Sequence, residues 1–197
     1  MTQTHRLLTL AMAGLVLAGT MVGRAAPQTA RPASKARSGS AADAARIKRG
    51  EYLVNIASCH DCHTPLAMTP KGPQPDMTRA LSGHPQDLVL PPPPPAVGIW
   101  GLRASLTNTA WAGPWGVSFT ANITPDEETG LGSWTEEMFV ATVRTGRHQG
   151  KGRVILPPMV IPALQTATDD DLKAIFWYLQ SVKPIRNKVP TPIEPAE

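Results

Sequence analysis

Cysteine is scarce in this chain. Only two of the 197 residues are cysteines, Cys59 and Cys62. A structural zinc site needs four ligands, and the histidines that could help (His60, His84 and His148) lack the paired spacing of zinc-binding sequences. A disulfide between cysteines separated by two residues would close a tight ring and gain little loop entropy. The sequence therefore favours neither a zinc site nor a structural disulfide.

Net charge is nearly absent from most of the chain. Residues 1–42 contain five basic residues and no acidic one, which leaves 14 of the 19 Lys and Arg residues against all 15 Asp and Glu residues in 43–197. A near-neutral domain lacks the basic surface that binds phosphate backbones. We therefore expect no nucleic-acid partner.

Long apolar runs are also missing, except near the N-terminus. An apolar stretch of about 17 residues follows Arg6 and is at the short limit for crossing a bilayer. Gly23-Arg24-Ala25 has the small-x-small pattern that signal peptidase recognises. We predict a signal peptide over residues 1–25 and a periplasmic protein. The alternative is an uncleaved anchor in the inner membrane that faces the periplasm. Residues 26–42 predict a flexible linker.

No segment alternates apolar and polar residues as a half-buried strand does, so a mostly α fold with long loops is predicted. The first helix is expected over residues 43–57, after Ser40 as N-cap. A second should follow the capping box Ser133-Trp134-Thr135-Glu136 and end at Gly146. A third should begin at Thr168, where three acidic residues suit the start of a helix.

Residues from about 65 to 120 form an insert that is rich in Pro, Gly and Trp. Five prolines, Pro91 to Pro95, favour polyproline II and exclude both a helix and a central strand. We interpret them as a stiff surface loop and not as a ligand for a proline-binding domain, because such recognition suits intracellular signalling. Trp100, Trp111 and Trp115 are expected to pack over something large and apolar.

The two cysteines belong to the stretch Cys59-His60-Asp61-Cys62-His63. A thioredoxin-like redox pair lies at a helix start beside a β-α-β unit, and this sequence predicts no such strands. The pattern C-x-x-C-H instead attaches a c-type haem: both thiols form thioethers with the haem vinyl groups, and the histidine ligates the iron. Cys59 and Cys62 are thus predicted as covalent anchors and His63 as the proximal ligand.

The sixth position of the iron has several candidates. They are Met68, Met77, Met138, Met159, His84 and His148. Met138 is expected in the core, and the first two methionines lie on a segment expected to be flexible. Met159 follows Leu156-Pro157-Pro158, where two prolines stiffen the loop, so it is the preferred ligand. A thioether ligand raises the reduction potential and suits electron transfer, whereas an open or displaceable position would suit a haem enzyme or a gas-binding module.

Three segments carry a resemblance to a known family. They are RGEYLVNIASCHDCHTP, NITPDEETGLGSWTEEMFVATVRTGRHQGKGRVILPPM and TDDDLKAIFWYLQSVKPI. Together they resemble class I cytochrome c, and they are similar to single-haem modules in the cytochrome subunits of membrane-bound dehydrogenases. The insert departs from that pattern.

The resemblance implies a class I cytochrome c domain over residues 43–187, followed by a tail at 188–197. Its first and last helices would cross with Gly50 at the contact and Trp177 or Tyr178 against it. It implies one covalent haem c with axial ligands His63 and Met159. It also implies an electron carrier and not an enzyme, working between a dehydrogenase donor and a cytochrome or oxidase acceptor of a respiratory chain.

Overall fold

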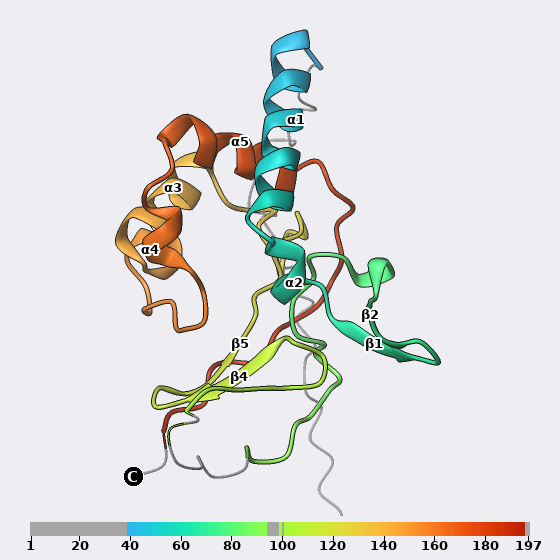
Figure 1. Cartoon of the computed structure of the whole chain (residues 1–197). Helices are drawn as coiled ribbons and strands as arrows, with labels where there is room; N and C mark the ends of the chain where they lie inside the picture. Colours follow the sequence, from blue (N-terminus) through green and yellow to red (C-terminus); the bar gives the residue numbers. More distant parts are fainter. Residues whose placement is uncertain (1–38, 94–98, 100, 196–197) are drawn as a thin grey trace, which may run out of the picture. The chain divides into compact units, whose positions relative to one another are not determined.

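The computed structural model describes residues 39–93, 99 and 101–195 (Figure 1). The predicted signal peptide, most of the predicted linker and Trp100 lie outside the described residues. The helices are α1 (Ala41–Ile56), α2 (Cys59–His63), α3 (Glu136–Thr145), α4 (Ile161–Leu164) and α5 (Asp169–Leu179), with 3-10 turns η1 (Met77–Arg79) and η2 (His148–Gly150). In this part of the chain, no helix combines the length and apolar character needed to cross a bilayer.

Side-chain caps define where the longer helices begin. Ser40 caps α1 as predicted, and with Asp43 it forms a reciprocal box in which each side chain accepts the other residue's backbone N–H. Thr168 caps α5 as predicted. The predicted start of α3 at Ser133 is wrong. Thr135 is the N-cap and accepts the N–H of Met138, because the preceding residues are still in a turn.

The helices α1 and α5 cross at Gly50, as the resemblance implied (Figure 1). A β-carbon at Gly50 would lie 1.9 Å from the carbonyl oxygen of Ala174 and 2.8 Å from the β-carbon of Tyr178. An ion pair of 2.9 Å between Arg49 and Asp171 joins the same helices. The main core includes residues of both crossing helices and consists of Val54, Leu81, Leu131, Val143, Leu172, Ile175 and Leu179.

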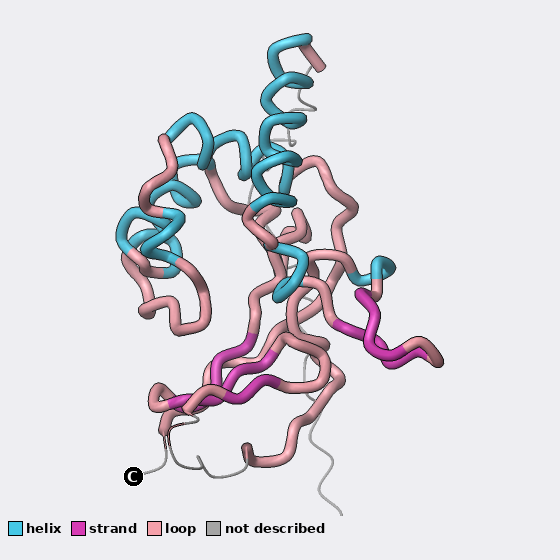
Figure 2. The backbone as a smooth tube through the Cα atoms, in the orientation of Figure 1, coloured by secondary structure: helices cyan, strands magenta, loops and turns pink. Residues whose placement is uncertain are grey.

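The expectation of a mostly α fold with an irregular insert is wrong for residues 65–120, which contain two small antiparallel sheets (Figure 2). The first pairs β1 (Leu66–Thr69) with β2 (Gly72–Pro75). The second has the order β3 (Arg103–Ala104), β4 (Ala110–Gly113) and β5 (Gly116–Phe119). Strands of two to four residues are too short to show alternation in a sequence window.

The β1–β2 and β4–β5 hairpins each turn through a proline. In Thr69-Pro70-Lys71-Gly72 and Gly113-Pro114-Trp115-Gly116, proline is the second residue of the turn and glycine the fourth, which are preferred β-turn positions. Gly116 has a positive φ of 90°, and a β-carbon there would lie 2.0 Å from the carbonyl oxygen of Ile193. That close approach exists because the described part of the tail pairs with β5 through Val117 and Ile193.

The helix crossing makes Gly50 sensitive to any added volume. We expect Gly50→Ala to lower the free energy of unfolding by about 1–3 kcal/mol, the usual cost of overpacking, because the new methyl group meets rigid backbone. Gly101→Ala is the matched control, since its β-carbon would meet nothing within 4 Å. Denaturant unfolding of the two variants measures the difference, and equal stabilities would contradict the tight contact.

Candidate haem site

The helix α1 leads through Ser58, which has a positive φ of 55°, into the short helix α2. Both cysteines on α2 are half-buried and are not joined by a disulfide. Burial raises the pKa of the Cys59 thiol to about 11, and burial also raises the pKa of Cys62. A redox-active pair needs the opposite shift, because the thiolate is the reactive form. The environment of these thiols therefore disfavours the disulfide-exchange function.

His63 is buried, with 7% of its surface exposed. Its Nδ1 lies 2.8 Å from the carbonyl oxygen of Ala121. A carbonyl can only accept, so Nδ1 carries the proton and the lone pair of Nε2 stays available. Burial lowers the pKa of the ring, with the Ala121 bond opposing that shift, so the imidazole is neutral. A neutral ring oriented through its second nitrogen is the usual state of a metal-binding histidine.

The insert is fastened directly to α2. The side-chain amide of Asn108 donates to the carbonyl oxygen of Asp61 at 2.7 Å. The backbone N–H of Leu66 donates to the carbonyl oxygen of Thr107 at 2.9 Å. The loop between β3 and β4 therefore holds the backbone of the Cys-x-x-Cys-His helix.

The segment with Met159 is attached to the same sheet. The hydroxyl of Ser118, on β5, donates to the carbonyl oxygen of Pro157 at 2.5 Å. Ala121, which accepts from His63, is only three residues further along the chain. Because an extended chain spans at most about 3.6 Å per residue, the Cα atoms of Ser118 and Ala121 are at most about 11 Å apart. The structure thus brings the Met159 loop and His63 to one region.

His84 and His148, the alternative candidates for the sixth position of the iron, lie in different environments. His84 is fully buried, and both of its ring nitrogens have partners: Nδ1 is 2.9 Å from the hydroxyl of Thr109, and Nε2 is 3.1 Å from the carbonyl oxygen of Leu88. It has no nitrogen left for iron. His148 is on the surface in η2, where its ring meets Trp134 edge-on at 5.1 Å between centroids.

The other candidate methionines in the described part of the chain are more exposed than Met159 (37%). Met68 on β1 and Met77 on η1 are 67% and 63% exposed. The expectation that Met138 lies in the core is wrong, because it is 39% exposed. Met138 is in the first turn of α3, and the core contacts of that helix are made by residues further along, such as Val143.

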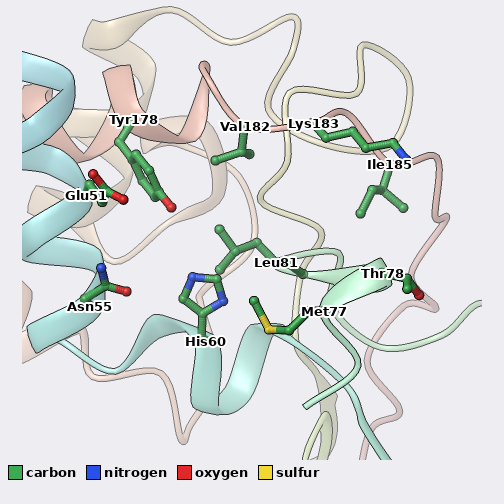
Figure 3. Close-up of a pocket in the computed structure, with 11 residues that line it drawn as sticks. Glu51, Asn55, His60, Met77, Thr78, Leu81, Tyr178, Val182, Lys183 and Ile185 are labelled. Carbon is green, nitrogen blue, oxygen red and sulfur yellow. The ribbon is translucent and has the colours of Figure 1, made fainter. Parts of the chain in front are cut away.

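A pocket of about 310 Å³ lies near α2 but does not coincide with these residues (Figure 3). His60 and Met77 point into it from one side and Tyr178 from the other. None of Cys59, Cys62, His63 and Met159 lines it. Its lining residue His60 occupies a variable position of the C-x-x-C-H motif.

Buried donors in the insert test whether the described residues suit a haem. Arg103 Nε and Nη1 and Trp111 Nε1 are buried and have no hydrogen-bond partner in the described protein. An unsatisfied buried donor costs about 1–3 kcal/mol, so such groups indicate a ligand that carries acceptors. A haem carries two carboxylates. Together with two thiols and a neutral imidazole, these donors form a set of groups that fits haem c.

Comparison with known proteins supports the same assignment. No family model matches the chain. It is 32% identical over 152 residues to the cytochrome c subunit of a quinone-dependent alcohol dehydrogenase of Gluconobacter oxydans (strain 621H), covering 76% of this chain and 24% of the relative. The chain is similar to cytochrome c subunits of dehydrogenases.

Two further relatives are also named as cytochrome subunits of dehydrogenases. Identity is 30% over 172 residues with the cytochrome subunit of a fructose dehydrogenase of Gluconobacter japonicus, covering 87% of this chain and 27% of that protein. The identity is 29% over 145 residues with the gluconate 2-dehydrogenase cytochrome c subunit of Pantoea cypripedii, and the match covers 73% of this chain and 25% of that protein. The chain spans about a quarter of the length of these relatives. The resemblance to cytochrome subunits of dehydrogenases that was inferred from the sequence is confirmed.

Proposed function

We propose that this chain is an electron carrier that binds one haem c through thioether bonds to Cys59 and Cys62, with His63 and Met159 as axial ligands. The observation that carries the proposal is the C-x-x-C-H helix whose histidine is buried, neutral and oriented by Ala121. The similarity to cytochrome c subunits supports it. The single motif corresponds to one haem, because the chain has no further cysteine.

When bound, the haem supplies an iron that alternates between the ferric and ferrous states. The protein's part is to hold the ligands and set the potential. The bond from His63 to Ala121 fixes the ring plane and increases the basicity of the ligating nitrogen. The thioether of Met159 favours the ferrous state more than a second imidazole would, which raises the potential.

The proposed setting follows from the N-terminus and from the relatives. A signal peptide over residues 1–25 delivers the chain to the periplasm, where it accepts electrons from a dehydrogenase and passes them to a respiratory cytochrome or oxidase. A haem-based gas-binding or catalytic module is the second candidate. It is favoured by one observation, the 37% exposure of Met159, which would ease displacement of this ligand.

Covalent attachment is the first test. We expect the full chain, exported from a host that assembles c-type cytochromes, to have the mass of the polypeptide plus one haem. The haem should resist acidic organic extraction. Cys59→Ala and Cys62→Ala should each retain one thioether and shift the α-band of the pyridine haemochrome. His60→Ala, at a variable position of the motif, is the control, and an exported wild-type chain without haem would refute the proposal.

Ligation by Met159 is tested by spectroscopy. Met159→Ala should abolish the far-red absorbance band of the ferric protein and allow the ferrous protein to bind carbon monoxide, because the sixth position loses its thioether. Met77→Ala is the control, since that side chain is 63% exposed on η1. Rapid carbon monoxide binding by the reduced wild type would instead support the gas-binding alternative.

Ser118 provides a finer test, because its hydroxyl holds the carbonyl of Pro157 near Met159. We expect Ser118→Ala to keep the far-red band near neutral pH. As the pH is raised, the variant should lose the band at a lower midpoint than the wild type. A hydrogen bond of about 1 kcal/mol corresponds to a midpoint about 0.7 pH unit lower. The matched control is Ser181→Ala, which removes a hydroxyl-to-carbonyl bond to Tyr178 at the end of α5. Identical midpoints in both variants and the wild type would show that Ser118 does not steady the loop.

A further inference from the structure

His84 is a buried titratable side chain that the proposed function does not use. It is fully buried, and its ring packs against that of Phe119 with 4.8 Å between the centroids. Nε2 lies 3.1 Å from the carbonyl oxygen of Leu88, which can only accept, so Nε2 carries the proton. Nδ1 is therefore an acceptor, and the hydroxyl of Thr109, 2.9 Å away, donates to it. The direction of this bond determines the direction of the bonds beyond it.

Three hydroxyl groups connect His84 to the surface of the insert. Thr107 Oγ1 is 2.8 Å from Thr109 Oγ1, and Ser105 Oγ is 2.9 Å from Thr107 Oγ1. Because Thr109 donates to the imidazole, Thr107 donates to Thr109 and Ser105 donates to Thr107. Thr109 is fully buried, whereas Thr107 and Ser105 are half-buried. The chain of hydroxyls thus leads from the buried ring to a side chain that solvent reaches.

His84 is also close to the proposed proximal ligand. The N–H of Gly83 donates to the carbonyl oxygen of His63 at 2.8 Å. With standard backbone dimensions, the Cα atoms of His63 and His84 are therefore at most about 10 Å apart. The N–H of His84 donates to the carbonyl oxygen of Thr120 at 3.0 Å, and the next residue, Ala121, accepts from the ring of His63. A charge on His84 therefore interacts with a charge at the iron, because water screens buried groups only weakly.

Two charged side chains face His84, and they form an ion pair of 3.5 Å with each other. They are Arg79 and Asp87. Burial is the main cause that holds the pKa of the His84 ring below its usual value, and the bond to Leu88 opposes this effect. Arg79 lowers the pKa further, and Asp87 raises it. The ring is therefore neutral near pH 7, and it takes up a proton only at lower pH or when its surroundings become more negative.

We propose that His84 takes up a proton when the haem is reduced. The hydroxyls of Ser105, Thr107 and Thr109 conduct this proton from solvent. The proposal rests on the function proposed above, in which a redox partner supplies the electron. The added electron makes the haem site more negative by one unit, which stabilises a positive imidazolium nearby.

The transfer leaves every hydroxyl intact. A hydronium ion gives a proton to Ser105, each hydroxyl passes its own proton to the next, and Thr109 gives its proton to Nδ1 of His84. The products are one water molecule and one imidazolium. The three hydroxyls then donate in the opposite direction, and Thr109 accepts from Nδ1.

Coupling of this kind is reciprocal, so the proton must also change the potential. The wild-type midpoint potential should rise as the pH falls from about 7 to about 5, because the protonated ring disfavours the ferric state. His84→Gln should lose most of this rise, since its amide can still donate to Leu88 and accept from Thr109 but does not titrate. His148→Gln is the control and should keep the rise, because that histidine is exposed on η2.

Carbon-13 NMR of the haem-loaded protein with labelled histidine tests the site directly. The pKa of the His84 ring should be about one unit higher in the ferrous than in the ferric protein, a tenfold gain in proton affinity. The pKa of His148 should be the same in both oxidation states. This measurement uses the wild type, so it decides the matter even if His84→Gln does not accumulate. A His84 pKa that is independent of the oxidation state would overturn the proposal.

The path is tested by Thr107→Val, which removes the middle hydroxyl but keeps the shape of the side chain and the backbone carbonyl that accepts from Leu66. Proton uptake after rapid photoreduction, followed with a pH-indicator dye, should be slower than in the wild type, while the dependence of the potential on pH is retained. Thr166→Val is the control, because it removes an exposed hydroxyl that donates to Ala163. An unchanged rate of uptake in Thr107→Val would exclude the hydroxyls as the path.

Mass and the far-red band separate this proposal from the proposed function. A protein with covalent haem and an intact band, but with the same His84 pKa in both oxidation states, would overturn the proposal and leave the electron carrier standing. An exported wild-type chain without covalent haem would overturn both.

Discussion

The contact between α1 and α5 at Gly50 is the constraint on which the arrangement of the site depends. It admits no side chain, so the two helix backbones touch and the direction of α1 is fixed. Since α2 follows α1 after a single turn at Ser58, fixing α1 also fixes where the cysteines and His63 lie. His63 is buried, and this burial keeps the imidazole neutral. A helix–helix contact thereby helps to set the position of the candidate iron ligand.

The insert provides further contacts that position the candidate site, in addition to those of the helices. Residues 105–121 bind the backbone of α2 at Asp61, accept a hydrogen bond from His63 and hold the loop before Met159. The two axial-ligand candidates, nearly a hundred residues apart in sequence, are therefore positioned by one short stretch of sheet. This explains how a chain with a small helical core can carry a long insert in its middle, because the insert forms part of the site.

Local chemistry determined which features could be predicted from the sequence. The C-x-x-C-H motif, the caps at Ser40 and Thr168 and the glycine at the helix contact depend on residues close together or on a strict steric need, and each was readable. The strands were missed because they are too short for periodicity, although Pro and Gly at fixed turn positions signalled the β1–β2 and β4–β5 hairpins. The bonds of Ser118 and Asn108 link segments far apart in the chain, and no local pattern encodes such pairs.

The pairing of Ile193 with Val117 has a consequence for the integrity of the sheet. The strand β5 would otherwise present a row of unpaired backbone groups along one side, and such a row is a template for association with another chain. The tail covers part of that row, so it protects the protein from edge-to-edge aggregation. The tail also restrains β5, the strand that carries Ser118. Because Ser118 binds Pro157, the tail indirectly helps to hold the loop of Met159.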